Sequence, residues 1–265
     1  EYDITDALCD GENTIVVMAK DDTRSDRQPT GKQCVEYVSL DCAYTRTTGI
    51  WQTVWLEFMP KSHIKTTKYY SDINNGIIHI AADIVGTGTL SVKAYYVGKL
   101  CGSCETVVNK NGCGSVRLAL QLDEIHLWEV GHGRLYDLEL TFGEDTVHSY
   151  FGLRSVQLDG MKFLLNGKSV FQRLVLDQGF YPDGIYTAPT EEALERDIHL
   201  SLAAGFNGAR LHEKAFEPRF LYHCDRLGYM VWGEHANWGL NVSTLEAINA
   251  YYPEWTELVD RDFNH

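Results

Sequence analysis

The stretch TEEALERDIHLSLAAGFNGARLHEKAFEPRFLYHCDRLGYMVWGE, residues 190–234, decides the fold. Thr190 is a good N-cap for a first helix, and two glutamates after it suit the positive end of that helix. Pro218 suits the first position of a second helix, and Gly228 suits the position just after its end. Short apolar strands are predicted at residues 208–211 and 229–233. This alternation of helices and strands predicts βα units and a parallel sheet.

The pattern extends on both sides of this stretch. Asn166-Gly167 is a strong two-residue hairpin signal, and an apolar run at 170–176 follows it as the first strand of the sheet. Downstream, Ser243 and Glu246 form a capping box for a last helix. A parallel sheet of three strands is too small to bury both faces well. The chain also lacks an initial Met and a signal peptide, so we expect it to be cut from a longer protein.

Residues 1 to about 160 have a different pattern, that of short strands separated by turns. Tyr136–Phe142 alternates apolar and polar side chains, which predicts a half-buried strand. Further strands are expected at 14–19, 50–58, 77–85, 90–97 and 115–122, with turns at 74–76, 86–88 and Asn111-Gly112. Several short strands joined by such turns are typical of a β-sandwich. Trp51 and Trp55 alternate on one of these strands and are expected to pack in its core.

Composition and charge exclude some classes of partner. The 265 residues carry a formal charge of −14, which repels phosphate backbones and makes nucleic acid a poor partner. No apolar run is long enough for a membrane span, so no membrane partner is expected. The seven cysteines are odd in number and irregularly spaced, which favours reduced thiols and a cytoplasmic location. Cys101, Cys104 and Cys113 offer three zinc ligands where a structural site needs four, so free thiols on a turn are the better interpretation.

Polar side chains follow each predicted parallel strand, where functional groups gather in βα proteins. Asp177 and Gln178 follow the first strand, and Arg210 and His212 end the second. Glu234 ends the third strand, and the loop after it carries Asn237 and Trp238. Carboxylates and amides bind hydroxyl groups and aromatic rings pack on sugar faces, so these residues form a candidate sugar pocket.

Three of these residues also have structural interpretations. Arg210 and Asp177 could form an ion pair that serves only stability. His212 could be a hydrogen-bonded core histidine. Glu234 follows an apolar strand and would be costly to bury without partners, which favours a site role.

Several motifs together resemble family 2 glycoside hydrolases of the β-galactosidase type. They are Tyr44–Gln52, Tyr150–Arg154 with the Asn166-Gly167 hairpin, Val175–Gly184, Gly205–His212, Phe220–Gly228 and Val231–Glu234. The motifs follow the family order and cover nearly the whole chain. The resemblance implies a multidomain β plus α/β protein. Residues 1–59 would end a jelly-roll sugar-binding domain, 60–150 would form an immunoglobulin-like sandwich, and 151–265 would begin a (β/α)8 TIM barrel.

The resemblance also implies an activity, the hydrolysis of terminal β-linked sugars. Among these sugars, β-galactosides are the first expected substrates. Members of the family are retaining enzymes with two carboxylates about 5–5.5 Å apart. Both carboxylates would lie beyond residue 265, so we expect no catalytic residue in this chain and no activity from it alone. Arg210 and Glu234 match family positions, whereas His212 is offset by one. The segment Asn237-Trp238-Gly239 replaces the family's Glu-x-His magnesium arrangement, so no metal and no other cofactor is expected.

Two rival interpretations remain. The same fold could act on another β-glycoside such as a β-glucuronide, whose carboxylate would need basic partners, and these are expected beyond residue 265. Alternatively, the chain could be a non-catalytic carbohydrate-binding fragment. A homo-oligomeric full-length enzyme is compatible with either.

Overall fold

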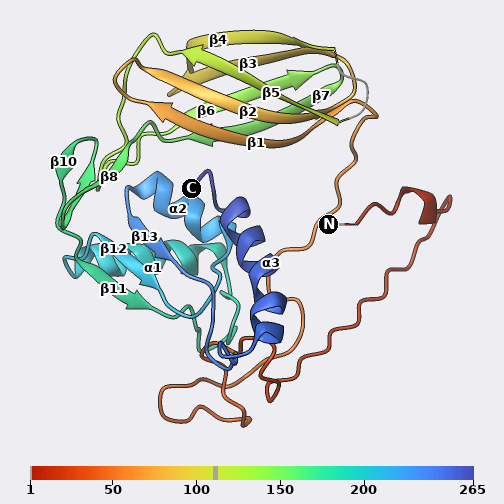
Figure 1. Ribbon diagram of the computed structural model, residues 1–265, viewed down its shortest axis with the longest axis vertical. Coiled ribbons are helices and arrows are strands. Elements are labelled where there is room, and N and C mark those ends of the chain that lie inside the picture. The colour runs from red at the N-terminus through yellow and green to blue at the C-terminus, as the bar shows by residue number, and fades with distance from the viewer. Residues whose placement is uncertain (1, 110–112) are drawn as a thin grey trace.

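The computed structural model describes residues 2–109 and 113–265 and shows two layered units joined by a hairpin (Figure 1). The turn expected at Asn111-Gly112 lies outside the described residues. The upper unit in the figure is built only from strands, and the lower unit combines a small sheet with helices. Among the described residues, no helix is both long and apolar enough to cross a membrane.

The upper unit is a sandwich of two antiparallel sheets, as the alternating pattern predicted. The first sheet has the order β1-β2-β5 and the second has the order β4-β3-β6-β7. Their strands are β1 (His63–Asp72), β2 (Ile77–Val85), β3 (Gly88–Tyr96), β4 (Lys99–Val108), β5 (Cys113–Gln121), β6 (Tyr136–Phe142) and β7 (Asp145–Phe151). Alternate side chains of β6 are buried, which is how a strand lines a core between two sheets. Cys101 belongs to this core, and all seven cysteines are free thiols.

A three-stranded hairpin sheet connects the sandwich to the lower unit. It consists of β8 (Val156–Asp159), β9 (Lys162–Leu165) and β10 (Lys168–Ser169). Asn166 and Gly167 have φ values of 52° and 75°, so both central residues of the turn between β9 and β10 are left-handed. This is the geometry of a type I′ turn, for which Asn-Gly is the preferred pair. The predicted hairpin is therefore confirmed.

The lower unit is a parallel sheet with helices, again as predicted. The strands β11 (Leu174–Asp177), β12 (Gly208–Leu211) and β13 (Met230–Gly233) pair in that order and all in parallel. The helices are α1 (Glu191–Ala203), α2 (Pro218–Leu227) and α3 (Leu245–Arg261). Apolar side chains of α1 and α2 form one core with the facing side of β12, including Leu194, Ile198, Ala209 and Leu211. On the other side of the sheet, Met230 packs against Trp128 and Leu165, whereas Leu176 and Trp232 nearer the strand ends are exposed.

The helix ends follow the sequence signals with one exception. Thr190 caps α1 by accepting a hydrogen bond from the Ala193 N–H, and Gly228 ends α2 in the left-handed conformation. The predicted cap of α3 was wrong, because Thr244 rather than Ser243 is the N-cap. Ser243 instead donates its N–H to Asn241 Oδ1 within the preceding turn, so it lies outside the helix start.

The strands expected in the first 60 residues do not form. Residues 14–19 and 50–58 are irregular, and the described part of this segment contains only the 3-10 helix η1 (Thr5–Ala7) and isolated bridges. A strand needs a neighbour to satisfy its backbone groups, and neither run finds one here. The packing expected for Trp55 is also wrong, because its side chain is exposed. Trp51 does pack, with its ring edge against Tyr186 in the lower unit.

A buried aspartate on α2 ties the sandwich to the lower unit. The Asp225 side chain is 8% exposed and lies 3.4 Å from Arg154 NH2 and 2.9 Å from His265 Nδ1. It also accepts a hydrogen bond from the Tyr150 hydroxyl at 3.2 Å. The Trp128 indole donates to the Asp225 carbonyl oxygen. The Asp225 carboxylate on α2 therefore contacts β7, the loop that follows β7, and the last described residue.

We predict that Asp225→Ala weakens this junction strongly, because it leaves the partly buried Arg154 without its anion. Removing one partner of a buried ion pair costs about 3 kcal/mol or more. The matched control is Asp260→Ala, which breaks the Lys68–Asp260 pair, where the aspartate is 61% exposed. Exposed pairs contribute little to stability, because solvent screens them. Urea unfolding of both variants measures the two losses, and equal losses would contradict the assignment of Asp225 as the junction.

Candidate functional site

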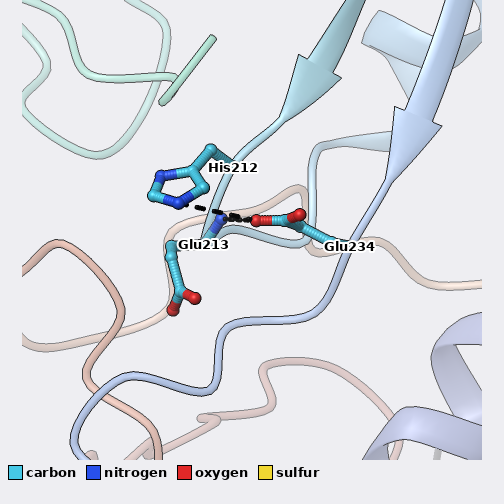
Figure 2. A group of neighbouring side chains, drawn as sticks. All are labelled: His212, Glu213 and Glu234. Carbon is cyan, nitrogen blue, oxygen red and sulfur yellow. Dashed lines mark hydrogen bonds and ion pairs between the residues drawn. The ribbon is translucent and has the colours of Figure 1, made fainter. Parts of the chain in front are cut away.

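The candidate site lies where the three parallel strands end. Because β11, β12 and β13 are parallel, the residues that follow them leave the same edge of the sheet. The ladder continues one step past β11, since the His212 N–H donates to the Asp177 carbonyl oxygen at 2.7 Å. Figure 2 shows three of these side chains, His212 and Glu213 after β12 and Glu234 after β13.

Glu234 is the carboxylate on which the site is centred. Arg210 donates from Nε to Glu234 Oε2 at 2.9 Å and from NH2 to Oε1 at 3.4 Å. The Glu213 N–H donates to Oε1 at 2.8 Å, and His212 Nε2 lies 3.9 Å from the same oxygen (Figure 2). An arginine fork of this kind fixes both the position and the orientation of a carboxylate.

The ion pair considered between Arg210 and Asp177 is not formed. Arg210 points to the open side of the sheet, in register with Leu176 and Trp232, which are also exposed. Strand alternation places Asp177 on the other side, with Val175, which packs against the helix core. Thus the sheet separates the side chains of Asp177 and Arg210, although the two residues lie on neighbouring strands.

Glu213 lies just after β12, where the sequence places a polar residue without assigning it a role in the site. Its side chain is buried, and Oε2 accepts hydrogen bonds at 2.9 Å from the N–H groups of both Asn237 and Trp238. Its φ of 56° is left-handed, which is rare for a residue with a Cβ. This conformation turns the chain so that the carboxylate holds the loop after β13. The only sequence signal was its place beside His212, because a positive φ cannot be read from a glutamate.

Trp238 stands at the rim of the site with 42% of its surface exposed. His212, which is nearly buried, meets it edge to face at 5.7 Å between ring centroids. His212 Nδ1 is buried and has no hydrogen-bond partner in the described residues, so this histidine is not the fully bonded core residue considered above. On the indole ring lies the ammonium group of Lys32, 3.9 Å from the centroid. The sequence did not point to Lys32, which comes from the irregular N-terminal segment.

The loop after β11 is organised around a second lysine that the sequence did not reveal. Lys214 Nζ donates to the carbonyl oxygens of Gly179 and Tyr186 and lies among the rings of Trp51, Phe180, Tyr186 and Phe216. Burial lowers the pKa of Lys214 to about 8. Gly179 is required here, because it has a φ of 61° and a Cβ would lie 2.9 Å from Lys214 Nζ.

Asp177 and Gln178 stand at the start of this loop. Asp177 Oδ1 accepts a hydrogen bond from the Gly179 N–H. Burial raises the pKa of Asp177, while that hydrogen bond and the charge of Lys214 oppose the shift. Gln178 Oε1 is buried without a partner in the described residues. In that part of the chain, no side-chain hydrogen bond joins either residue to Arg210, His212 or Glu234, so the side chains of the predicted pocket residues fall into two groups.

His212, Glu213 and Glu234 also have the donor types of a metal site, with potential ligand atoms within 4.8 Å of one another. However, Glu234 already faces the Arg210 cation, and Glu213 already accepts two backbone N–H groups. Both carboxylates are compensated without an ion. The expectation that no metal binds here stays a prediction.

Known proteins resemble the chain along its full length. It is 27% identical to a β-galactosidase of Thermoanaerobacter pseudethanolicus across 100% of the chain and 36% of that protein. It is 25% identical to a putative β-glucuronidase of Formosa agariphila across 99% of the chain and 32% of that protein. The chain thus spans about a third of the length of these curated relatives. No family model matches it.

Solved structures agree with this picture. A family 2 glycosyl hydrolase from Bacteroides cellulosilyticus superposes with a TM-score of 0.74, at 23% identity, over 87% of this chain and 33% of that one. A β-glucuronidase from Ruminococcus gnavus gives a TM-score of 0.67 at 20% identity, over 78% of this chain and 36% of that one. The expected resemblance to family 2 glycoside hydrolases is confirmed. These relatives are named β-galactosidase and putative β-glucuronidase.

We predict that Glu213→Ala loosens the loop after β13. The change removes the acceptor of two backbone N–H groups and leaves them without a partner, which costs about 2 kcal/mol or more. Glu213→Gln keeps an acceptor oxygen and should lose less. Hydrogen exchange at the amides of Asn237 and Trp238 reports the effect locally. Unchanged protection of both amides in Glu213→Ala would contradict this role.

A second prediction concerns the pH dependence of Asp177. Its pKa in the folded chain is raised above the ordinary 3.8, so the folded state binds the proton more tightly than the unfolded chain does. The stability that this group contributes is present below pH 3.8 and is lost as the pH rises through the folded pKa. Asn cannot ionise and its Oδ1 can still accept the Gly179 N–H. The difference in Tm between Asp177→Asn and the wild type should therefore shift in favour of the variant as the pH rises from 4 to 7.

The control for this prediction is Asp183→Asn, an exposed aspartate of the same loop. Its Tm difference from the wild type should not change across that pH range. A gain of equal size in both variants would show that burial of Asp177 is not the cause.

Proposed function

We propose that the chain belongs to an enzyme that hydrolyses terminal β-linked sugars, and that the ends of β11, β12 and β13 form part of its sugar pocket. The observation that carries the proposal is the Arg210–Glu234 fork beside His212 and Trp238, at the carboxyl ends of parallel strands. A rigid carboxylate can bind sugar hydroxyls, and a partly exposed indole offers a surface for the sugar ring.

The finer architecture is part of the same proposal. Residues 151–265 would be the first strands and helices of a (β/α)8 barrel, whose interior would meet the open face of Leu176, Arg210 and Trp232. Residues 60–150 would be the immunoglobulin-like domain of such an enzyme, and residues 1–59 the end of a jelly-roll domain. In support, exposed apolar side chains gather in the irregular N-terminal segment, including Ile15, Val16, Val17, Met18, Trp55, Leu56 and Phe58.

In this proposal, Arg210 orients Glu234, and Glu234 supports the sugar-binding shell. His212, Asn237 and Trp238 complete the pocket, and Asp177 and Gln178 would border it from the separate loop after β11. The reaction would be of the retaining type, with one carboxylate as acid/base and another as nucleophile. We assign neither role to a residue of this chain. A cytoplasmic location is proposed with it, because the seven cysteines are free thiols.

Two sugar classes are candidates for the substrate. The sequence motifs favour β-galactosides as the first candidate, and one relative is named a β-galactosidase. β-Glucuronides come second, because another relative and a similar structure are named β-glucuronidases. The structure adds an observation for the second class, since the Lys32 ammonium group lies on the Trp238 indole, 3.9 Å from the ring centroid. A carbohydrate-binding role without catalysis is the remaining alternative.

The test measures sugar binding by the 265-residue chain, with tryptophan fluorescence and ligand-observed NMR as the two readouts. We expect a methyl β-D-glycoside to bind the wild type, and Arg210→Ala to weaken binding about tenfold or more through lost positioning. Because the Arg210 side chain is 51% exposed, its removal should change the Tm little. The control is Arg196→Ala, an exposed arginine on α1.

The opposite pattern would exclude the functional assignment of the fork. If Arg210→Ala lowers the Tm strongly and leaves sugar affinity unchanged, the Arg210–Glu234 pair serves stability alone. Turnover of chromogenic β-galactosides and β-glucuronides by a longer protein that contains this chain then separates an enzyme from a binding module.

A further inference from the structure

Lys32 is a buried cation without an anion. The residue is 4% exposed, and its ammonium group lies 3.9 Å from the centre of the Trp238 ring. In residues 2–109 and 113–265 we find no hydrogen bond and no ion pair of this group. An ammonium carries three N–H donors, and lysine is rarely buried unless it is paired. The indole face attracts the charge but accepts none of these donors in the way an oxygen does.

The position of Lys32 is fixed by its neighbours in the chain. The N–H groups of Thr30 and Gly31 both donate to the Trp238 carbonyl oxygen, at 2.7 and 3.2 Å, and the Lys32 carbonyl oxygen accepts from the Tyr44 N–H at 2.7 Å. The segment around Lys32 is thus attached to the loop after β13 through its backbone. The side chain is therefore held at the site by contacts that do not involve its charge.

The carboxylates nearest to this point are compensated by other groups. Glu234 faces the Arg210 fork, and Glu213 accepts the N–H groups of Asn237 and Trp238. Neither lies within ion-pair distance of Lys32 among the described residues. The site as a whole thus combines two satisfied carboxylates with one unsatisfied ammonium, next to an aromatic surface that remains 42% exposed.

We propose that Lys32 and Trp238 form a subsite for an anionic substituent on the bound sugar, a carboxylate or a sulfate group. The sugar ring packs on the exposed part of the Trp238 indole, and the anionic group accepts hydrogen bonds from Lys32 Nζ. His212 Nδ1, buried and unpartnered beside the same indole, is available to a hydroxyl of that sugar. The subsite rests on the proposed function, because it takes the strand-end pocket to be a sugar site.

The formal charge of −14 makes this proposal specific. A chain that acidic repels an anionic ligand in general, so a preference for one must come from a local cation. The other strong cations near the strand ends are occupied. Arg210 binds Glu234, and Lys214 donates to the carbonyl oxygens of Gly179 and Tyr186.

The test compares two ligands that differ only at C6, methyl β-D-glucuronide and methyl β-D-glucoside. Titrations followed by tryptophan fluorescence give the Kd of each for the 265-residue chain. We expect the glucuronide to bind about tenfold more tightly, which is about 1.4 kcal/mol. Methyl β-D-galactoside 6-sulfate distinguishes the two anion sources: tight binding of both anions indicates a general anion subsite, and tight binding of one identifies the group that fits.

The variant Lys32→Met keeps the length of the side chain and removes the charge. The ratio of the glucoside Kd to the glucuronide Kd should then fall to about one. Lys32→Arg keeps the charge and should retain a preference, which guards against a folding defect in the first variant. Lys20→Met, an exposed lysine of the same segment, is the matched control and should behave as the wild type.

Two outcomes would overturn the subsite in different ways. If the neutral glucoside binds as tightly as both anionic sugars, or if Lys32→Met keeps the preference while folded, the anion subsite is wrong and the sugar pocket stands. If none of the three sugars binds, the pocket itself is wrong and the subsite with it.

Discussion

Parallel pairing of three short strands is the constraint on which the candidate site depends. Each strand contributes four residues. They pair in register, from Leu174, Gly208 and Met230 at one end of the sheet to Asp177, Leu211 and Gly233 at the other. Backbone hydrogen bonds therefore bring residues separated by more than 20 positions in sequence to one edge. The helices cover one side of this sheet, which leaves Arg210 free on the other side to reach Glu234. The site is a consequence of this arrangement and needs no special conformation except the left-handed turn at Glu213.

The charges at this edge are arranged so that each carboxylate has a donor. Glu234 is held by an arginine and a backbone N–H, and Glu213 is held by two backbone N–H groups. In the neighbouring loop, burial shifts the pKa of Asp177 upward and that of Lys214 downward, to about 8. Both shifts show that burial disfavours the charged form of the side chain. Such pKa shifts are common at functional sites and also occur in structural networks. The irregular N-terminal segment joins both groups, through Trp51 at Lys214 and through Lys32 at Trp238.

Much of the fold could be predicted because its signals are local. Thr190, Pro218, Gly228 and Asn166-Gly167 mark boundaries through their own backbone preferences, and the structure confirms each of them. The strands expected at 14–19 and 50–58 were wrong for a physical reason. Alternation shows that a segment can form a strand, but a strand exists only where another strand pairs with it.

The site was predictable in part for a similar reason. Strand ends can be read from sequence, so Arg210, His212 and Glu234 were found, and the structure brings them together. The face on which a side chain lies depends on register, and for this reason Asp177 was grouped with Arg210 although the sheet separates them. Lys32 and Lys214 could not be found, because each acts through contacts with distant segments. Glu213 required a positive φ, which its residue type disfavours.

The central claim is that the ends of β11, β12 and β13 bind a sugar. The most direct measurement is a set of ¹H–¹⁵N correlation spectra of the chain, recorded as methyl β-D-glucuronide is added. The account predicts shifts of the Trp238 indole signal and of the amides of residues 210–213 and 234–238. Shifts confined to the β-sandwich, or no shifts at millimolar sugar, would contradict it.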